Sequence, residues 1–86
     1  MPELSRFYGI VIKMYFDDHQ PPHFHVYYVE ERAIIEIETM RIIGGRLSPR
    51  IHRLVADWGN RHRAQLRENW RRVIAHEAPF WIEPDE

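Results

Sequence analysis

The chain contains no cysteine, and this absence excludes several classes of protein. Without thiols there is no disulfide framework, no cysteine nucleophile and no cysteine-ligated zinc or iron–sulfur site. The apolar runs are far shorter than the roughly 20 residues that a membrane-spanning helix needs. The first residues also lack the basic start and apolar stretch of a signal peptide, so we expect a cytoplasmic protein without a membrane partner. Any chemistry must therefore fall to histidine and carboxylate groups.

What is present is enough for one small globular domain. The chain has 86 residues, of which 44% are hydrophobic and 29% are charged, a mixture typical of folded rather than disordered proteins. We therefore expect a single domain spanning residues 1–86. A chain of this length buries only about 60% of the surface that it exposes when unfolded, so its core must be dense.

The formal net charge of −1 conceals an uneven distribution. Residues 1–40 hold three basic and seven acidic groups, residues 41–72 hold nine arginines and two acids, and the remaining residues hold four acids. A segment this basic could bind RNA, although a solvated helix face is the plainer interpretation. The arginines that would contact RNA are Arg50, Arg53, Arg61, Arg63, Arg67, Arg71 and Arg72.

Strand-type patterns fill the first half of the chain. Residues 7–16 and 23–29 are rich in β-branched and aromatic residues, and residues 33–39 alternate apolar and polar positions. Ile42 and Ile43 predict a short fourth strand before a glycine pair, and residues 80–82 predict a short edge strand. We expect an antiparallel meander of three to four strands.

A helical pattern follows from residue 49. Ser48 and Pro49 are typical of a helix start. The apolar stripe then comprises Ile51, Leu54, Val55, Trp58, His62, Leu66, Trp70, Val73 and Ile74. One straight helix over residues 49–76 would be roughly 42 Å long, too long for so small a domain, so we expect it to kink or split near Gly59 and Asn60. The fold class is therefore α+β, with the helix packed on one face of the sheet.

Three histidines carry the strongest chemical signal. His23 and His25 alternate along a predicted strand, so both rings project from one face, and His19 precedes them in a loop with two aspartates. Depending on strand register, Glu36 or Glu38 could stand opposite these rings. Such a set of nitrogens and carboxylates suits a divalent Zn, Ni, Mn or Fe ion.

The same histidines admit two other interpretations. His23 and His25 could divide general-acid and general-base duties, with a nearby arginine such as Arg6, Arg41 or Arg46 stabilising a phosphoryl transition state, as in a metal-independent ribonuclease. The plainer alternative is structural, with the histidines hydrogen-bonded to the aspartate-containing loop. The sequence leaves all three open.

A family resemblance covers nearly the whole chain. It rests on residues 21–25 (PPHFH), 35–38 (IEIE) and 62–70 (HRAQLRENW), together with the start of the chain. These segments resemble a family of small bacterial proteins catalogued as domain of unknown function 4160. The resemblance brings no catalytic residues with it. It implies a small protein partner encoded nearby, in a two-gene unit of toxin–antitoxin type.

We therefore expect a cytoplasmic binding module that works with a protein partner. One alternative is a small RNase-like or metal-dependent hydrolase that uses His19, His23 and His25. A second alternative is a structural domain that forms homo-oligomers through its edge strands and Trp81.

Overall fold

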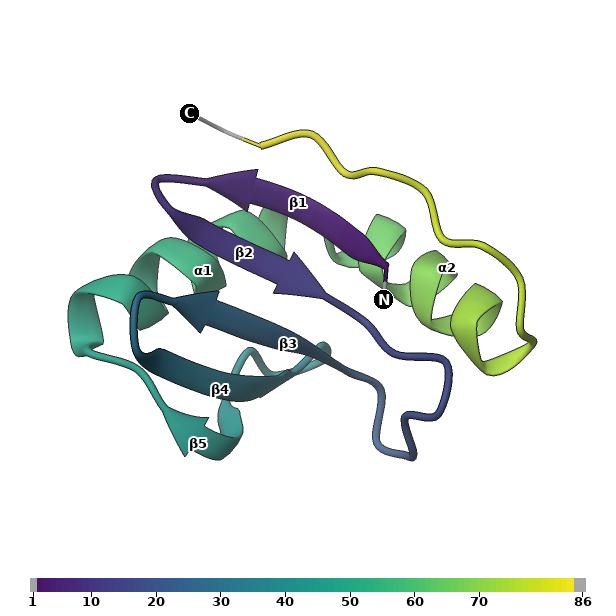
Figure 1. The fold of residues 1–86 in the computed structure, drawn as a ribbon, viewed down its shortest axis with the longest axis horizontal. Helices are drawn as coiled ribbons and strands as arrows, with labels where there is room; N and C mark the ends of the chain where they lie inside the picture. The colour runs from purple at the N-terminus through teal and green to yellow at the C-terminus, as the bar shows by residue number, and fades with distance from the viewer. Residues whose placement is uncertain (1, 85–86) are drawn as a thin grey trace.

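The five strands and two helices of the chain form two layers. The structure, a computed structural model, describes residues 2–84. Its elements are β1 (Glu3–Phe7), β2 (Ile10–Lys13), β3 (His23–Tyr28), β4 (Glu31–Glu36), β5 (Ile42–Arg46), α1 (Pro49–Arg61) and α2 (Arg63–Ile74). The strands form one antiparallel sheet in chain order, and both helices lie behind the sheet in the view of Figure 1. The α+β prediction is confirmed, with five strands rather than three to four.

The additional strand is β1, which precedes the segment predicted as one strand over residues 7–16; that segment holds only the end of β1, a turn and β2. Tyr8 and Gly9 both adopt positive φ, at 52° and 79°, and Phe7 faces Ile10 across them. Positive φ at both central residues is typical of a type I′ hairpin turn. Tyr8 continues the apolar alternation of its neighbours, so the sequence pattern conceals the turn. The same effect at Val29, with φ 52°, lets β4 begin at Glu31 rather than at residue 33.

The core lies between the sheet and the helices. Its largest fully buried side chains are Trp58, Phe24, Leu4, Ile10, Ile12, Met14, Ile35, Ile37, Ile51, Leu66, Ile82 and Val26. Phe24 and Val26 face this core from β3, and by strand alternation the residues between them face the opposite side of the sheet. One face of the sheet is thus covered by helices, and the other is not.

The helical segment divides as predicted, but three residues later than Gly59. α1 ends at Arg61 and α2 begins at Arg63, with His62 between them. Gly59 lies inside α1, where a β-carbon would come within 2.5 Å of the Met40 sulfur. Gly59 therefore permits close packing of α1 against the loop before β5 and does not end the helix. Neither helix in residues 2–84 has the length and apolarity needed to cross a lipid bilayer.

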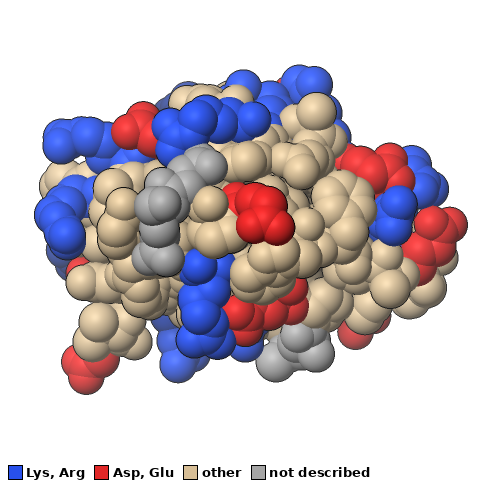
Figure 2. Space-filling model, turned by 90° about the horizontal axis from the view of Figure 1, so that it is seen from above, with Lys and Arg blue, Asp and Glu red and all other residues tan. Residues whose placement is uncertain are grey.

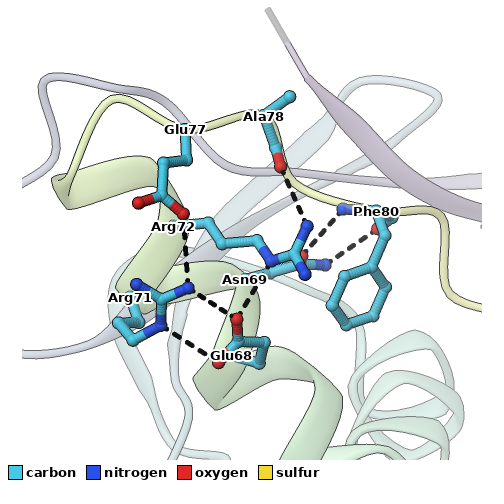
Figure 3. Close-up of polar contacts among 7 residues, drawn as sticks. All are labelled: Glu68, Asn69, Arg71, Arg72, Glu77, Ala78 and Phe80. Carbon is cyan, nitrogen blue, oxygen red and sulfur yellow. Dashed lines mark hydrogen bonds and ion pairs between the residues drawn. The ribbon is translucent and has the colours of Figure 1, made fainter.

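The C-terminal segment lies beside β1 and crosses α2 without forming the predicted strand over residues 80–82 (Figure 1). Ile82 is fully buried, and its N–H donates to the Leu4 carbonyl at 2.7 Å. Asn69 of α2 hydrogen-bonds both backbone groups of Phe80 (Figure 3). The Trp58 indole N–H donates to the Glu83 carbonyl at 3.2 Å. Side chains of the helices thus form hydrogen bonds with backbone groups of the C-terminal segment that a neighbouring strand would otherwise bind.

Candidate metal centre

The candidate site begins with two histidines on β3. His23 and His25 alternate with the buried residues Phe24 and Val26 along β3. The His25 ring lies on the open side of the sheet, whereas His23, at the first position of the strand, also reaches Trp70 of α2. His25 pairs in register with Lys13 of β2 and Ile34 of β4. The two rings meet edge to face with centroids 5.2 Å apart. The strand period alone thus brings both rings together, as the sequence predicts.

Asp18 supplies the carboxylate, from the loop between β2 and β3. One of its oxygens, Oδ2, accepts the Tyr15 backbone N–H at 3.1 Å, while the Asp18 N–H donates to the Tyr15 carbonyl at 3.2 Å. His25 Nε2 lies 3.1 and 3.2 Å from the two carboxylate oxygens, and His23 Nε2 lies 3.4 Å from Oδ1. The local turn therefore aims the carboxylate at both rings.

Backbone contact fixes the orientation of His23. Its Nδ1 donates to the Pro21 carbonyl at 2.7 Å, because a carbonyl oxygen can only accept. A neutral ring then carries its lone pair on Nε2, the atom that faces Asp18. Metal-ligating histidines commonly hold their other nitrogen in this way. On its other side the His23 ring packs against Trp70 of α2, with centroids 5.0 Å apart.

Three potential metal-ligand atoms lie close together in this cluster. Asp18, His23 and His25 each offer a ligand atom, and these atoms all lie within 4.8 Å of one another. Two ligands at 2.0–2.2 Å from a tetrahedral ion would lie roughly 3.4 Å apart. The His23 Nε2–Asp18 Oδ1 distance of 3.4 Å matches this spacing, whereas His25 Nε2 lies at hydrogen-bond distance, 3.1 and 3.2 Å, from the two Asp18 oxygens.

A pocket opens in front of the three residues. It has a volume of about 290 Å³ and is lined by Asp17, Asp18, His19, Gln20, Pro21, His23, His25, Ile34 and Ile43. The side chains of Asp18, His23 and His25 are only 12%, 10% and 18% exposed, so they form the floor of the pocket. A carboxylate this poorly solvated needs charged or hydrogen-bonding partners, and His25 Nε2 and the Tyr15 N–H are such partners.

Two tyrosines flank the site. Tyr15 contacts His25 edge to face, at 4.5 Å between centroids, and its hydroxyl makes a short hydrogen bond with that of Tyr27. Burial, together with this hydrogen bond, raises the pKa of Tyr15 to about 12. The Tyr15 phenol is therefore neutral near neutral pH and can act as a hydrogen-bond donor beside the site.

The other residues named from the sequence lie at varying distances from this cluster. His19 lines the same pocket, at its exposed rim. Glu36 pairs in register with His23, but its carboxylate accepts the Thr39 hydroxyl at 2.6 Å. Glu38 instead forms an ion pair with Arg67. The carboxylate nearest the two rings comes from Asp18 and from neither glutamate, because the loop turn, rather than strand register, sets its position.

Arg6 is not part of the cluster. It lies on β1, and its guanidinium binds both oxygens of Glu3, at 2.8 and 2.9 Å. This contact lowers the pKa of Glu3. Arg6 therefore lies in an ion pair of its own on β1.

Many of the helical arginines have protein partners. Arg67 binds Glu38, while Arg71 and Arg72 share Glu68 (Figure 3). Arg63 donates to the Ile37 carbonyl at 3.1 Å. Figure 2 shows carboxylates beside basic groups on the face seen from the side of the C-terminal segment. The basic segment is thus partly neutralised in the fold.

Comparison with known proteins identifies a family but no characterised relative. A sequence profile described as "Domain of unknown function (DUF4160)" matches residues 9–71, which include the loop and strand that form the cluster. No curated protein and no solved structure matches the chain.

Proposed function

The chain belongs to the DUF4160 family, a domain family of unknown function, and we propose that it is a divalent-metal-binding domain whose protein ligands are Asp18, His23 and His25. The observation that carries this proposal is the convergence of three ligand atoms within 4.8 Å at the floor of a pocket. The His23–Pro21 hydrogen bond adds to it, because it turns the Nε2 lone pair toward the Asp18 carboxylate.

The ligand set indicates which ions suit the site. Two imidazoles and one carboxylate bind Zn²⁺ and also Fe²⁺, Mn²⁺ or Ni²⁺, and they leave at least one coordination position open. The pocket of about 290 Å³ provides room for a ligand at that position. A bound ion of this kind would polarise a ligand oxygen or activate a water molecule, which is the chemistry of a metal-dependent hydrolase.

The proposal is tested by equilibrium dialysis or calorimetry of protein prepared without a histidine tag. We expect one Zn²⁺ per chain for the wild type, and a loss of affinity of at least tenfold for Asp18→Asn and for His25→Ala. His76→Ala serves as the matched control, because His76 is an exposed histidine outside the cluster. Circular dichroism and thermal melts would verify that each variant is folded.

Two results would overturn the proposal. One is a wild-type protein that binds no more Zn²⁺, Mn²⁺ or Ni²⁺ than the Asp18→Asn variant does. The other is an equal loss of Zn²⁺ affinity in the His76→Ala control, which would indicate that zinc binds non-specifically to exposed histidines. In either case the Asp18–histidine contacts would be structural, holding the loop before β3 in place.

A role in partner binding is the second candidate. Ile43 lies on β5, the last strand of the sheet, where its side chain is 46% exposed beside the pocket. An edge strand presents backbone groups with which another chain can pair. Co-purification with the product of a neighbouring gene would test the toxin–antitoxin-like pairing, and Ile43→Asp should weaken it.

A further inference from the structure

The uncovered face of the sheet carries basic residues in rows that end at the candidate metal site. Strand register places Arg6, Val11, Tyr27, Arg32 and Arg46 directly opposite one another, one from each strand. The next row contains Glu3, Lys13, His25 and Ile34. Directly opposed residues of an antiparallel sheet share a face, and neighbouring strands lie about 4.8 Å apart. Cations from several strands therefore gather on the same face as His25.

Two of these cations converge on one aromatic ring. The Lys13 ammonium lies 5.3 Å from the centre of the Tyr27 ring, and the Arg32 guanidinium lies 5.5 Å from it. In residues 2–84 no carboxylate forms an ion pair with Lys13 or Arg32, whereas Arg6 is paired with Glu3. Glu3 lies opposite Lys13, and hydrogen bonding from Arg6 together with the charge of Lys13 lowers the pKa of Glu3, but its ion pair is with Arg6. Lys13 and Arg32 are therefore accessible to a ligand, and the ring contacts hold them in place.

The surface beside these cations is hollowed. A pocket of about 460 Å³ is lined by Arg6, Val11, Lys13, Tyr15, Tyr27, Val29 and Arg32, and no carboxylate is among them. A second pocket of about 250 Å³ shares Tyr27 and Arg32 with it, and shares His25 and Ile34 with the pocket at the metal site. The three hollows therefore adjoin one another across the sheet, from the basic rows to His25.

We propose that this face binds a single-stranded phosphodiester chain, RNA or DNA, through Lys13 and Arg32 and the Tyr15 and Tyr27 hydroxyls. The occupant is anionic because the lining is basic and lacks carboxylates. A flexible single strand fits adjoining hollows of one-nucleotide size, and exposed sheet faces with aromatic and basic residues are used for this purpose. The choice of phosphodiester over carboxylate rests on the proposed metal site, because a divalent ion with open positions binds phosphate oxygens.

The proposed nucleic-acid site lies on the sheet, whereas the sequence pointed to the arginine-rich helices. In residues 2–84 several helical arginines bind protein carboxylates, as Arg67 does with Glu38, whereas Lys13 and Arg32 do not. The sheet face and the helices lie on opposite sides of the molecule (Figure 1). Substitutions on the two surfaces therefore distinguish the two locations.

Fluorescence anisotropy of a labelled single-stranded RNA of mixed sequence, measured with a chelator present, tests the inference. We expect saturable binding at low salt and a steep decline in affinity between about 50 and 200 mM salt. Each lost phosphate contact to a single strand removes roughly 0.7 from the slope of log affinity against log salt. Lys13→Ala/Arg32→Ala should therefore reduce the slope by about 1.4, whereas the exposed helix pair Arg50→Ala/Arg53→Ala should leave it within about 0.3.

Repeating the measurement with DNA of the same sequence shows whether the site prefers RNA or DNA. Equal binding of the matching DNA would assign recognition to the backbone, and tighter binding of RNA would assign part of it to the 2′-hydroxyl; both support the inference. It is overturned if the wild type shows no saturable binding at low salt, if the helix pair loses as much as the sheet pair, or if poly-glutamate displaces the RNA equally well. Because the chelator removes metal, RNA binding without zinc binding rejects only the metal proposal, and the reverse result rejects only this inference.

Discussion

The side-chain amide of Asn69 hydrogen-bonds both backbone groups of Phe80. Its Nδ2 donates to the Phe80 carbonyl and its Oδ1 accepts the Phe80 N–H, each at 2.9 Å (Figure 3). Asn69 is fully buried, and the ring of Phe80 also packs under the Arg72 guanidinium at 4.9 Å. One amide thus takes the place of a neighbouring strand and fastens the C-terminal segment to α2.

Asn69→Ala should destabilise the protein by about 2–4 kcal/mol, because it leaves two backbone groups of Phe80 without partners. Chemical denaturation would measure the loss, and limited proteolysis should show earlier cleavage after α2. Asn60→Ala is the matched control. Asn60 is exposed, and we expect a change within about 0.5 kcal/mol. Equal losses in the two variants would contradict the role assigned to Asn69.

Gly45 and Gly44 of β5 should respond differently to alanine. Gly45 has φ 70°, and a β-carbon there would lie 2.2 Å from the Arg32 carbonyl oxygen, so Gly45→Ala should cost about 2 kcal/mol or more. At Gly44 the nearest atom is the end of the Ile34 side chain, at 3.2 Å, which can rotate away. Replacing a strand glycine recovers roughly 0.5–1 kcal/mol, so Gly44→Ala should be near neutral. Thermal melts giving the same loss for both would contradict this distinction.

The ionisation of Glu68 should make the stability of the protein depend on pH in the acidic range. Hydrogen bonds from Arg71 and Arg72 lower the pKa of Glu68 to about 2, from an ordinary value of 4.5. Because the pKa of Glu68 is lower in the folded than in the unfolded protein, ionised Glu68 stabilises the fold, and this stabilisation is complete above pH 4.5. It is lost as the pH falls from 4.5 through about 2 and the carboxylate becomes protonated. Glu68→Gln should therefore melt at a slightly lower temperature than the wild type at pH 7, with the difference closing between pH 4.5 and 2.

The exposed turn residue Glu30 provides the control for this experiment. Glu30→Gln should melt like the wild type throughout the range. Because the groups around Glu68 lie at the surface, the effect should also diminish in high salt. A difference for Glu68→Gln that persists unchanged at pH 2 would contradict the assignment.

His23 and His25 should differ in stability although both are proposed ligands. His23 is 7% exposed, packs on Trp70 and donates to the Pro21 carbonyl, so His23→Ala should cost about 1–3 kcal/mol. His25 faces the pocket but hydrogen-bonds the poorly solvated Asp18 carboxylate, so His25→Ala should cost about 1–2 kcal/mol. Denaturation curves would measure both. A larger loss for His25→Ala would mean that its ring holds the fold.

The sequence predicted the elements with clear periodicity and missed those set by single residues. Alternation in β3 and the stripe through Trp58 and Trp70 gave the correct faces, and the sheet and helices follow from them. The turn at Tyr8 was missed, because an aromatic residue at positive φ looks like strand in a pattern of apolar residues. The C-terminal segment was misread as strand because Asn69, a side chain, supplies its partners.

The candidate site shows the same division. Two residues of the cluster, His23 and His25, follow from the strand period alone. The third follows from a loop turn in which the Tyr15 N–H orients the Asp18 carboxylate, and no periodic pattern encodes this contact. The row that joins Tyr27 to Arg32 needs the register of β3 and β4, which a single sequence does not provide.

The most direct test of the account is a crystal structure of the protein grown with Zn²⁺, with anomalous data collected at the zinc edge. We predict one anomalous peak within 2.0–2.2 Å of His23 Nε2, His25 Nε2 and an Asp18 oxygen, with at least one further position open toward the pocket. A structure in which these three side chains hold one another as they do here, while zinc is absent or bound elsewhere, would contradict the central claim.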